Sequence, residues 1–176
     1  KIYCRAFQLA FRAALPFLPY RNPEIISSDA EIPAVLRKHE LQKVMIVTDA
    51  GIRKLGLTSF LEKTLAEEGI GYCIYDRTVA NPTIWNVEEA KDLYLKEGAQ
   101  ALIAFGGGSS MDTAKAIGII IRNPEFEDVR SLEGVAPTKN PSVPIIAVPT
   151  TAGTAAEVTI NYVITDVEKD RKMVCV

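Results

Sequence analysis

Short apolar runs alternate with amphipathic segments between residues 43 and 148, and this alternation constrains the fold more than any other feature of the sequence. Runs with the length and apolar character of buried strands lie at residues 43–48, 72–75, 101–105 and 143–148. The segments between them place apolar side chains at helical spacing. Strands that alternate with helices predict an α/β fold in which a parallel sheet is covered by helices on both faces.

Capping and breaking residues give the expected ends of these helices. One helix is expected to begin close to Pro33 and another to run from Thr58, a candidate N-cap, to Gly69. Asp49, Ala50 and Gly51 are interpreted as a break after the first strand. Two further helices are expected, one between the 81–83 loop and Gly98 and one over residues 111–121.

The end of the sequence has a different pattern. Two β-prone runs, residues 160–165 and 172–176, flank a charged segment over residues 166–171. Such a pair with a polar turn between its members predicts a β-hairpin. The expected fold is therefore a parallel sheet with a C-terminal β-hairpin.

Composition excludes several classes of protein. The 176 residues carry 20 Lys plus Arg and 22 Asp plus Glu, a net charge of −2, so no nucleic-acid partner is expected. The three cysteines form no C-x-x-C pair, which favours a reducing, cytoplasmic setting. A single histidine, His39, is too few for an ordinary zinc site, and we interpret it as a surface residue near a helix end. No metal site is expected in this chain.

Residues 1–20 are rich in apolar side chains but do not form a membrane span. Arg5 and Arg12 interrupt the stretch, and Pro16 and Pro19 close it, so it is too short and too broken to cross a bilayer. We expect residues 1–20 to be an extension, packed on the domain or on a partner subunit, and residues 21–176 to form the domain. No membrane partner is expected.

The glycine-rich turn after the 101–105 run is the first candidate site. Consecutive glycines let backbone N–H groups approach an anion, and the following helix offers its unpaired N–H groups to a phosphate. A pyrophosphate could rest on Gly107, Gly108 and Ser109. The turn matches neither the P-loop nor the G-x-G-x-x-G pattern, and glycines at such a corner can also serve the turn alone.

Polar residues at other strand ends give further candidates. Asp49 follows the first strand, where a carboxylate can accept hydrogen bonds from ribose hydroxyls and repel a 2′-phosphate, which favours NAD over NADP. A turn-forming role is the alternative for Asp49. Asp112 can stabilise its helix dipole with or without a ligand. Lys172 could reach a ribose or phosphate oxygen, or could simply lie exposed on an edge strand.

Two segments together resemble the hallmark sequences of the iron-containing, group III alcohol dehydrogenases. They are GGGSSMDTAK at residues 106–115 and PTTAGTAAEVT at residues 149–159. Residues 123–165 resemble the lactaldehyde reductase, or 1,2-propanediol oxidoreductase, branch in particular. The resemblance covers about residues 40–176 and implies the Rossmann-like, dinucleotide-binding half of the two-domain, dehydroquinate synthase-like fold.

The resemblance implies a set of cofactor contacts. Asp49 is similar to the family residue that holds the adenosine ribose, and Asn81 to one near the nicotinamide. Lys172 is similar to a ribose-binding lysine. The segment from Gly108 through Ser110 and Met111 to Asp112 resembles the pyrophosphate cradle. The residues similar to those around the adenine and ribose are Thr150, Thr151, Thr154, Thr159 and Asn161.

The resemblance also implies which parts lie elsewhere. In the family a helical C-terminal domain holds the catalytic Fe²⁺ or other divalent metal through one Asp and three His, and those positions would follow Val176. The expected activity is hydride transfer between NAD(H) and a small alcohol or aldehyde in the complete enzyme, as a homodimer. The alternatives are a dehydroquinate synthase-like or glycerol dehydrogenase-like domain, or a non-catalytic nucleotide-binding or dimerisation module.

Overall fold

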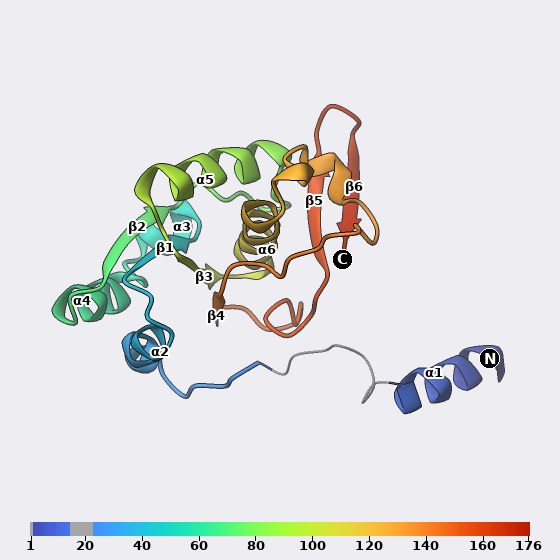
Figure 1. Cartoon of the computed structure of the whole chain (residues 1–176), viewed down its shortest axis with the longest axis horizontal. Helices are drawn as coiled ribbons and strands as arrows, with labels where there is room; N and C mark the ends of the chain where they lie inside the picture. The colour runs from blue at the N-terminus through green and yellow to red at the C-terminus, as the bar shows by residue number, and fades with distance from the viewer. Residues whose placement is uncertain (1, 15–22) are drawn as a thin grey trace.

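A four-stranded parallel sheet forms the centre of the domain in the computed structural model, which describes residues 2–14 and 23–176 (Figure 1). Its strands are β1 (Lys43–Val47), β2 (Gly71–Tyr75), β3 (Ala101–Gly106) and β4 (Ile145–Pro149). They lie in the order β2-β1-β3-β4. The four apolar runs of the sequence therefore form the sheet as expected, with shifts of one or two residues at their ends.

Helices cover both faces of this sheet, as the alternating pattern predicts. The helices α2 (Ile32–Lys38) and α4 (Ser59–Glu67) pack on one face, where Leu36 and Leu61 contact the same core as Ile46 and Ile103. The helices α5 (Ile84–Glu97) and α6 (Gly108–Arg122) pack on the other. Because consecutive β-strands are joined by these helices, all four strands run in the same direction.

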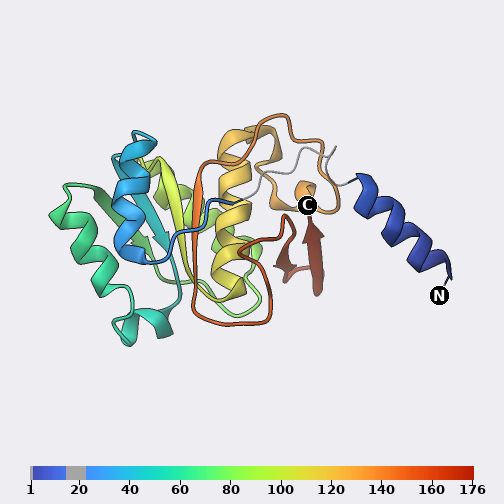
Figure 2. The same ribbon diagram turned by 90° about the horizontal axis from the view of Figure 1, so that it is seen from below.

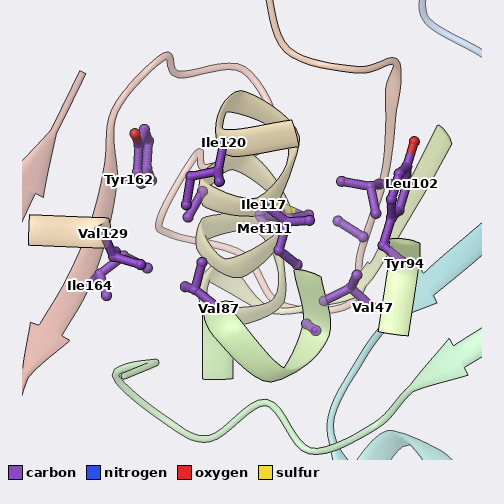
Figure 3. Packing of buried hydrophobic residues seen from close by; sticks show 14 of the residues in the cluster. Val47, Val87, Tyr94, Leu102, Met111, Ile117, Ile120, Val129, Tyr162 and Ile164 are labelled. Atoms are coloured by element: carbon purple, nitrogen blue, oxygen red, sulfur yellow. The ribbon is translucent and has the colours of Figure 1, made fainter. Parts of the chain in front are cut away.

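The helix α6 lies at the centre of the larger core. Ile117 and Met111 face the sheet residues Val47 and Leu102, whereas Ile120 faces the C-terminal hairpin (Figure 3). Since α6 is apolar on both sides, eight of its residues are buried. The helix is thus fixed between two layers, and so is the direction in which its N-terminus points.

The hairpin consists of β5 (Tyr162–Asp166) and β6 (Arg171–Cys175), which pair antiparallel as predicted. Tyr162 and Ile164 lie in the same core as α6. The turn is held by Arg130, whose Nε and Nη2 donate to Asp166 Oδ2 at 2.8 Å and Oδ1 at 3.2 Å. Arg130 belongs to the 3₁₀ helix η4 (Val129–Leu132), which follows η3 (Pro124–Phe126).

One short helix differs from the expected break after the first strand. Residues Ala50–Lys54 form α3, and Asp49 is its N-cap, accepting hydrogen bonds from the N–H groups of Gly51 and Ile52. Five residues are too few to show helical periodicity, so only the capping residue could have indicated this helix. At the other boundaries, Gly69 and Gly98 follow α4 and α5 with φ of 69° and 64°, as expected of C-terminal stops.

The N-terminal helix α1 (Ile2–Ala14) lies apart from the sheet and its covering helices in both views (Figures 1 and 2). The expected packing of the extension on the domain is therefore not seen for α1, and packing on a partner subunit stays a prediction. Residues 15–20, which include Pro16 and Pro19, lie outside the described residues. Within the described ranges, no helix is long and apolar enough to cross a bilayer.

Candidate functional site

The strand order puts a topological switch point at the carboxyl ends of β1 and β3. From β1 the chain crosses to β2 on one side, and it then returns to β3 on the other side of β1. Loops that leave adjacent strands in opposite directions separate at this point, and ligands of open α/β sheets bind there. The loops concerned begin at Asp49 and at Gly106, and the sequence predicts a candidate site at each of them.

Asp49 has one oxygen engaged and one available. Its Oδ1 accepts hydrogen bonds from Gly51 N at 2.8 Å and Ile52 N at 3.0 Å. Within the described part of the chain, Oδ2 accepts no hydrogen bond, and it lies 3.7 Å from the point that a Cβ on Gly106 would occupy. The capping role therefore leaves one oxygen of the carboxylate for the predicted ribose-binding role.

Gly106 and Ser110 form the floor of the glycine turn. Gly106 has a φ of +149°, a backbone conformation that residues other than glycine rarely adopt. A Cβ at this position would lie 2.6 Å from Ser110 Oγ. Ser110 is 1% exposed, and its Oγ has no hydrogen-bond partner among the described residues. An unpaired buried hydroxyl costs free energy, so this atom is available to a polar ligand or water beside the turn.

The threonine-rich loop closes over the glycine turn. Thr150 N donates to Gly106 O at 2.9 Å, which joins the two loops directly. A Cβ on Gly107 would lie 3.0 Å from Thr151 Oγ1, and one on Gly108 would lie 3.2 Å from Thr154 Oγ1. The absent side chains thus allow two threonine hydroxyls to approach the backbone at the start of α6.

The first turn of α6 presents donors at this point. Gly107 is the N-cap and has no side chain to accept from the free N–H groups of the turn, which include those of Gly108, Ser109 and Ser110. Met111 N approaches Gly107 O at 3.4 Å, and the Met111 side chain is buried in the core. Any contact of Met111 with a ligand would therefore be through its main chain.

Two partly buried residues of opposite charge, Asp112 and Lys115, lie about one turn apart on α6. Burial raises the pKa of Asp112 to about 6, against the opposing effects of Lys115 and of a hydrogen bond from the Val163 backbone. Burial also lowers the pKa of Lys115, against the effect of Asp112 and Glu157. Lys115 Nζ donates to Asn161 O at 2.9 Å and to Thr159 Oγ1 at 3.4 Å. Lys115 therefore ties the predicted adenosine-side loop to α6.

Lys115 was not among the residues predicted for the site. Its signal in the sequence is the spacing Asp112-x-x-Lys115, which puts opposite charges on one face of a helix. That spacing is common on exposed helices, and so it could not have indicated a contact with residues 159–161.

Asn81 and Lys172 meet although 91 positions separate them in the sequence. Lys172 Nζ donates to Asn81 Oδ1 at 2.8 Å, and Thr165 Oγ1 donates to Asn81 O at 3.3 Å. Asn81 has φ 56°, a left-handed conformation that asparagine tolerates. Two residues predicted separately for the ribose and the nicotinamide are thus neighbours, on the loop after β2 and on β6.

The predicted residues form four local groups. Asp49 lies with the turn, and Thr150, Thr151 and Thr154 lie beside it. Lys115, close to Asp112, holds Thr159 and Asn161, and Asn81 pairs with Lys172. The structure does not bring Asn81 into contact with Asp49. Over residues 2–14 and 23–176, no group of three or more His, Cys, Asp or Glu side chains could hold a metal ion. His39 is exposed and is the C-cap of α2, as interpreted from the sequence.

The family of this chain follows from comparison with known proteins. The family model described as "Iron-containing alcohol dehydrogenase" matches residues 24–176. The chain therefore belongs to the iron-containing alcohol dehydrogenase family, as the two hallmark segments indicate. The fold resembles an alcohol dehydrogenase from Oenococcus oeni, with a TM-score of 0.78 and 39% identity over 83% of this chain and 38% of that one.

Individual relatives agree with the family. The chain is 56% identical to lactaldehyde reductase of Escherichia coli over 141 residues, which are 80% of this chain and 37% of the relative. A structure titled as sulfoacetaldehyde reductase from Bifidobacterium kashiwanohense in complex with NAD⁺ matches with a TM-score of 0.74 and 28% identity, over 84% of this chain and 39% of that one. The chain thus spans well under half the length of these relatives.

Proposed function

We propose that this chain forms the NAD(H)-binding part of a metal-dependent, lactaldehyde reductase-like alcohol dehydrogenase. The observation that carries the proposal is the available Asp49 Oδ2 beside the glycine turn, at the carboxyl ends of β1 and β3. The 56% identity to lactaldehyde reductase and the similarity to a structure titled as a complex with NAD⁺ support it. The reaction would be hydride transfer between the nicotinamide and a small alcohol or aldehyde.

The residues around the glycine turn fit a diphosphate. The start of α6 offers free N–H groups and the positive end of the helix dipole, and Gly107 and Gly108 leave the approach clear of Cβ atoms. The threonine hydroxyls of the 150–154 loop can donate to the same anion. This part of the chain would bind and orient the diphosphate without a charged side chain.

Asp49 would select between the two nicotinamide dinucleotides. Its Oδ2 can accept from a ribose hydroxyl while Oδ1 keeps its two hydrogen bonds to α3. A 2′-phosphate at the same place would put a second negative charge close to the partly buried Asp49 carboxylate, which disfavours NADP.

Asn81 and Lys172 would complete the site on the nicotinamide side. The Lys172 ammonium keeps two donors besides the one used by Asn81 and can contact a ribose hydroxyl. When bound, the nicotinamide supplies hydride transfer, and this chain's residues hold it in place. Because the described residues offer no metal-binding group, no step through a metal is assigned to them.

Calorimetric titration of the 176-residue chain with NAD and with NADP tests this proposal. NAD should bind more tightly than NADP. Asp49→Ser keeps an N-cap acceptor for α3 but removes the charge. The affinity for NAD should therefore fall, and the preference for NAD over NADP should decrease.

Asp128→Ser is the matched control, since Asp128 also caps a short helix through its carboxylate, at η4. It should leave both affinities unchanged. An Asp49→Ser variant with the wild-type preference would contradict the role of Asp49, and absence of NAD binding by the folded chain would contradict the proposal as a whole.

A further inference from the structure

The helix α1 has an unusual charge distribution. No Asp or Glu occurs before Glu24, whereas Lys1, Arg5, Arg12 and Arg21 are basic. This leaves 16 basic and 22 acidic residues in the remainder, a net charge of −6 for residues 24–176. The positive charge is therefore concentrated in the N-terminal segment, on a chain that is otherwise acidic.

The basic residues of α1 lie on one stripe of the helix. Arg5, Gln8 and Arg12 are spaced by three and four residues, so they follow one another along the same face. Tyr3, Phe7 and Leu9 fall outside this stripe and are 80%, 61% and 75% exposed. A helix with a cationic stripe and exposed aromatic and aliphatic side chains is amphipathic.

The position of α1 gives its apolar side chains no place in the core. In both views the helix lies apart from the domain (Figures 1 and 2), and its described side chains are exposed. At 13 residues it is too short to span a bilayer, but it has the length of helices that lie in the plane of an interface. The expectation that the chain has no membrane partner rested on the lack of a span, which binding in the interface plane does not need.

We propose that α1 is an interfacial helix that binds the chain to an anionic lipid surface. The apolar side chains would enter the boundary between head groups and acyl chains, and Arg5 and Arg12 would contact the lipid phosphates. The charge complementarity favours an anionic surface over a zwitterionic one. The domain, with its net charge of −6, would be repelled from that surface, so attachment would occur through α1 alone.

Vesicle co-sedimentation of the 176-residue chain tests the proposal. The chain should bind vesicles of 30% phosphatidylglycerol in phosphatidylcholine, and should bind pure phosphatidylcholine vesicles much less. Raising NaCl from about 0.05 M to about 0.5 M should weaken binding, because the Debye length shortens from about 14 Å to about 4 Å.

Two variants separate the electrostatic from the apolar contribution. Arg5→Gln with Arg12→Gln keeps good helix formers and should lower partitioning by about thirtyfold, from the loss of two lipid-facing charges. Tyr3→Ser with Leu9→Ser keeps the charge of α1 and should also lower partitioning onto the vesicles. Lys96→Gln with Lys139→Gln removes two exposed charges of the domain and is the matched control, which should bind as the wild type does.

Other binding partners of α1 would give different results in these experiments. If α1 binds a second copy of the chain, the arginine variant will change the mass measured by light scattering without vesicles present. If α1 packs on its own domain, the same variant will lower the thermal unfolding midpoint. The proposal would be overturned by either of these results in a chain that does not bind anionic vesicles. It would also be overturned if the arginine variant bound those vesicles as well as the wild type does.

Discussion

Replacement of Gly106 by alanine tests the geometry of the glycine turn. Gly106 has φ +149°, and a Cβ would lie 2.6 Å from Ser110 Oγ and 3.2 Å from Ser110 Cβ. Rotation of the Ser110 side chain can move Oγ but not Cβ, which is fixed to α6, so the backbone itself must shift. The conformation costs about 1–3 kcal/mol and the overpacking about 1–3 kcal/mol, so we expect about 2–6 kcal/mol of lost stability.

Gly69→Ala is the matched comparison for Gly106→Ala. Gly69 also has a positive φ, +69°, but a Cβ there meets nothing within 4 Å. This variant should lose only the left-handed backbone cost of about 1–2 kcal/mol. The difference between the two variants therefore reports the contact with Ser110 together with the difference between the two backbone costs.

Thermal and urea unfolding followed by circular dichroism measures both variants. At roughly 2–4 °C per kcal/mol for a domain of this size, Gly106→Ala should lower the melting midpoint by about 4–24 °C. Gly69→Ala should lower it by only a few degrees. If Gly106→Ala is no more destabilising than Gly69→Ala, the close packing of the turn against Ser110 is wrong.

Two further predictions concern α6. Gly108→Ala puts a Cβ 3.1 Å from Thr154 Cγ2, on an exposed loop that can move aside. Stability should therefore change by less than about 1 kcal/mol, while the affinity for NAD should fall by about tenfold. An unchanged affinity in titration calorimetry would refute this prediction. Asp112 binds its proton more tightly in the folded state, because burial raises its pKa from 3.8 to about 6. The contribution of Asp112 to the free energy of unfolding should therefore fall as pH rises from about 4 to about 7. In urea unfolding over the same pH range, Asp112→Asn should lack this decrease. Parallel pH profiles for the two proteins would show that Asp112 does not titrate in this window.

Several features of the fold could be predicted because they depend on short stretches of chain. A buried strand needs an uninterrupted apolar run, such as residues 101–105, and a helix end can be recognised from a glycine such as Gly69 or Gly98. Alternation of strands and helices requires parallel strands, and parallel strands bring their carboxyl ends to one edge. The candidate loops at Asp49 and Gly106 could therefore be placed at one edge of the sheet from the sequence.

Other features depend on contacts between distant segments, which no local pattern contains. The order β2-β1-β3-β4 decides which loops become neighbours at the edge of the sheet, and it depends on pairing between strands that are distant in the sequence. The contact between Lys172 and Asn81 depends on how the hairpin docks, and that of Lys115 with Asn161 depends on how the loop returns to α6. The free oxygen of Asp49 is known only because the other oxygen caps a helix too short to be seen in the sequence.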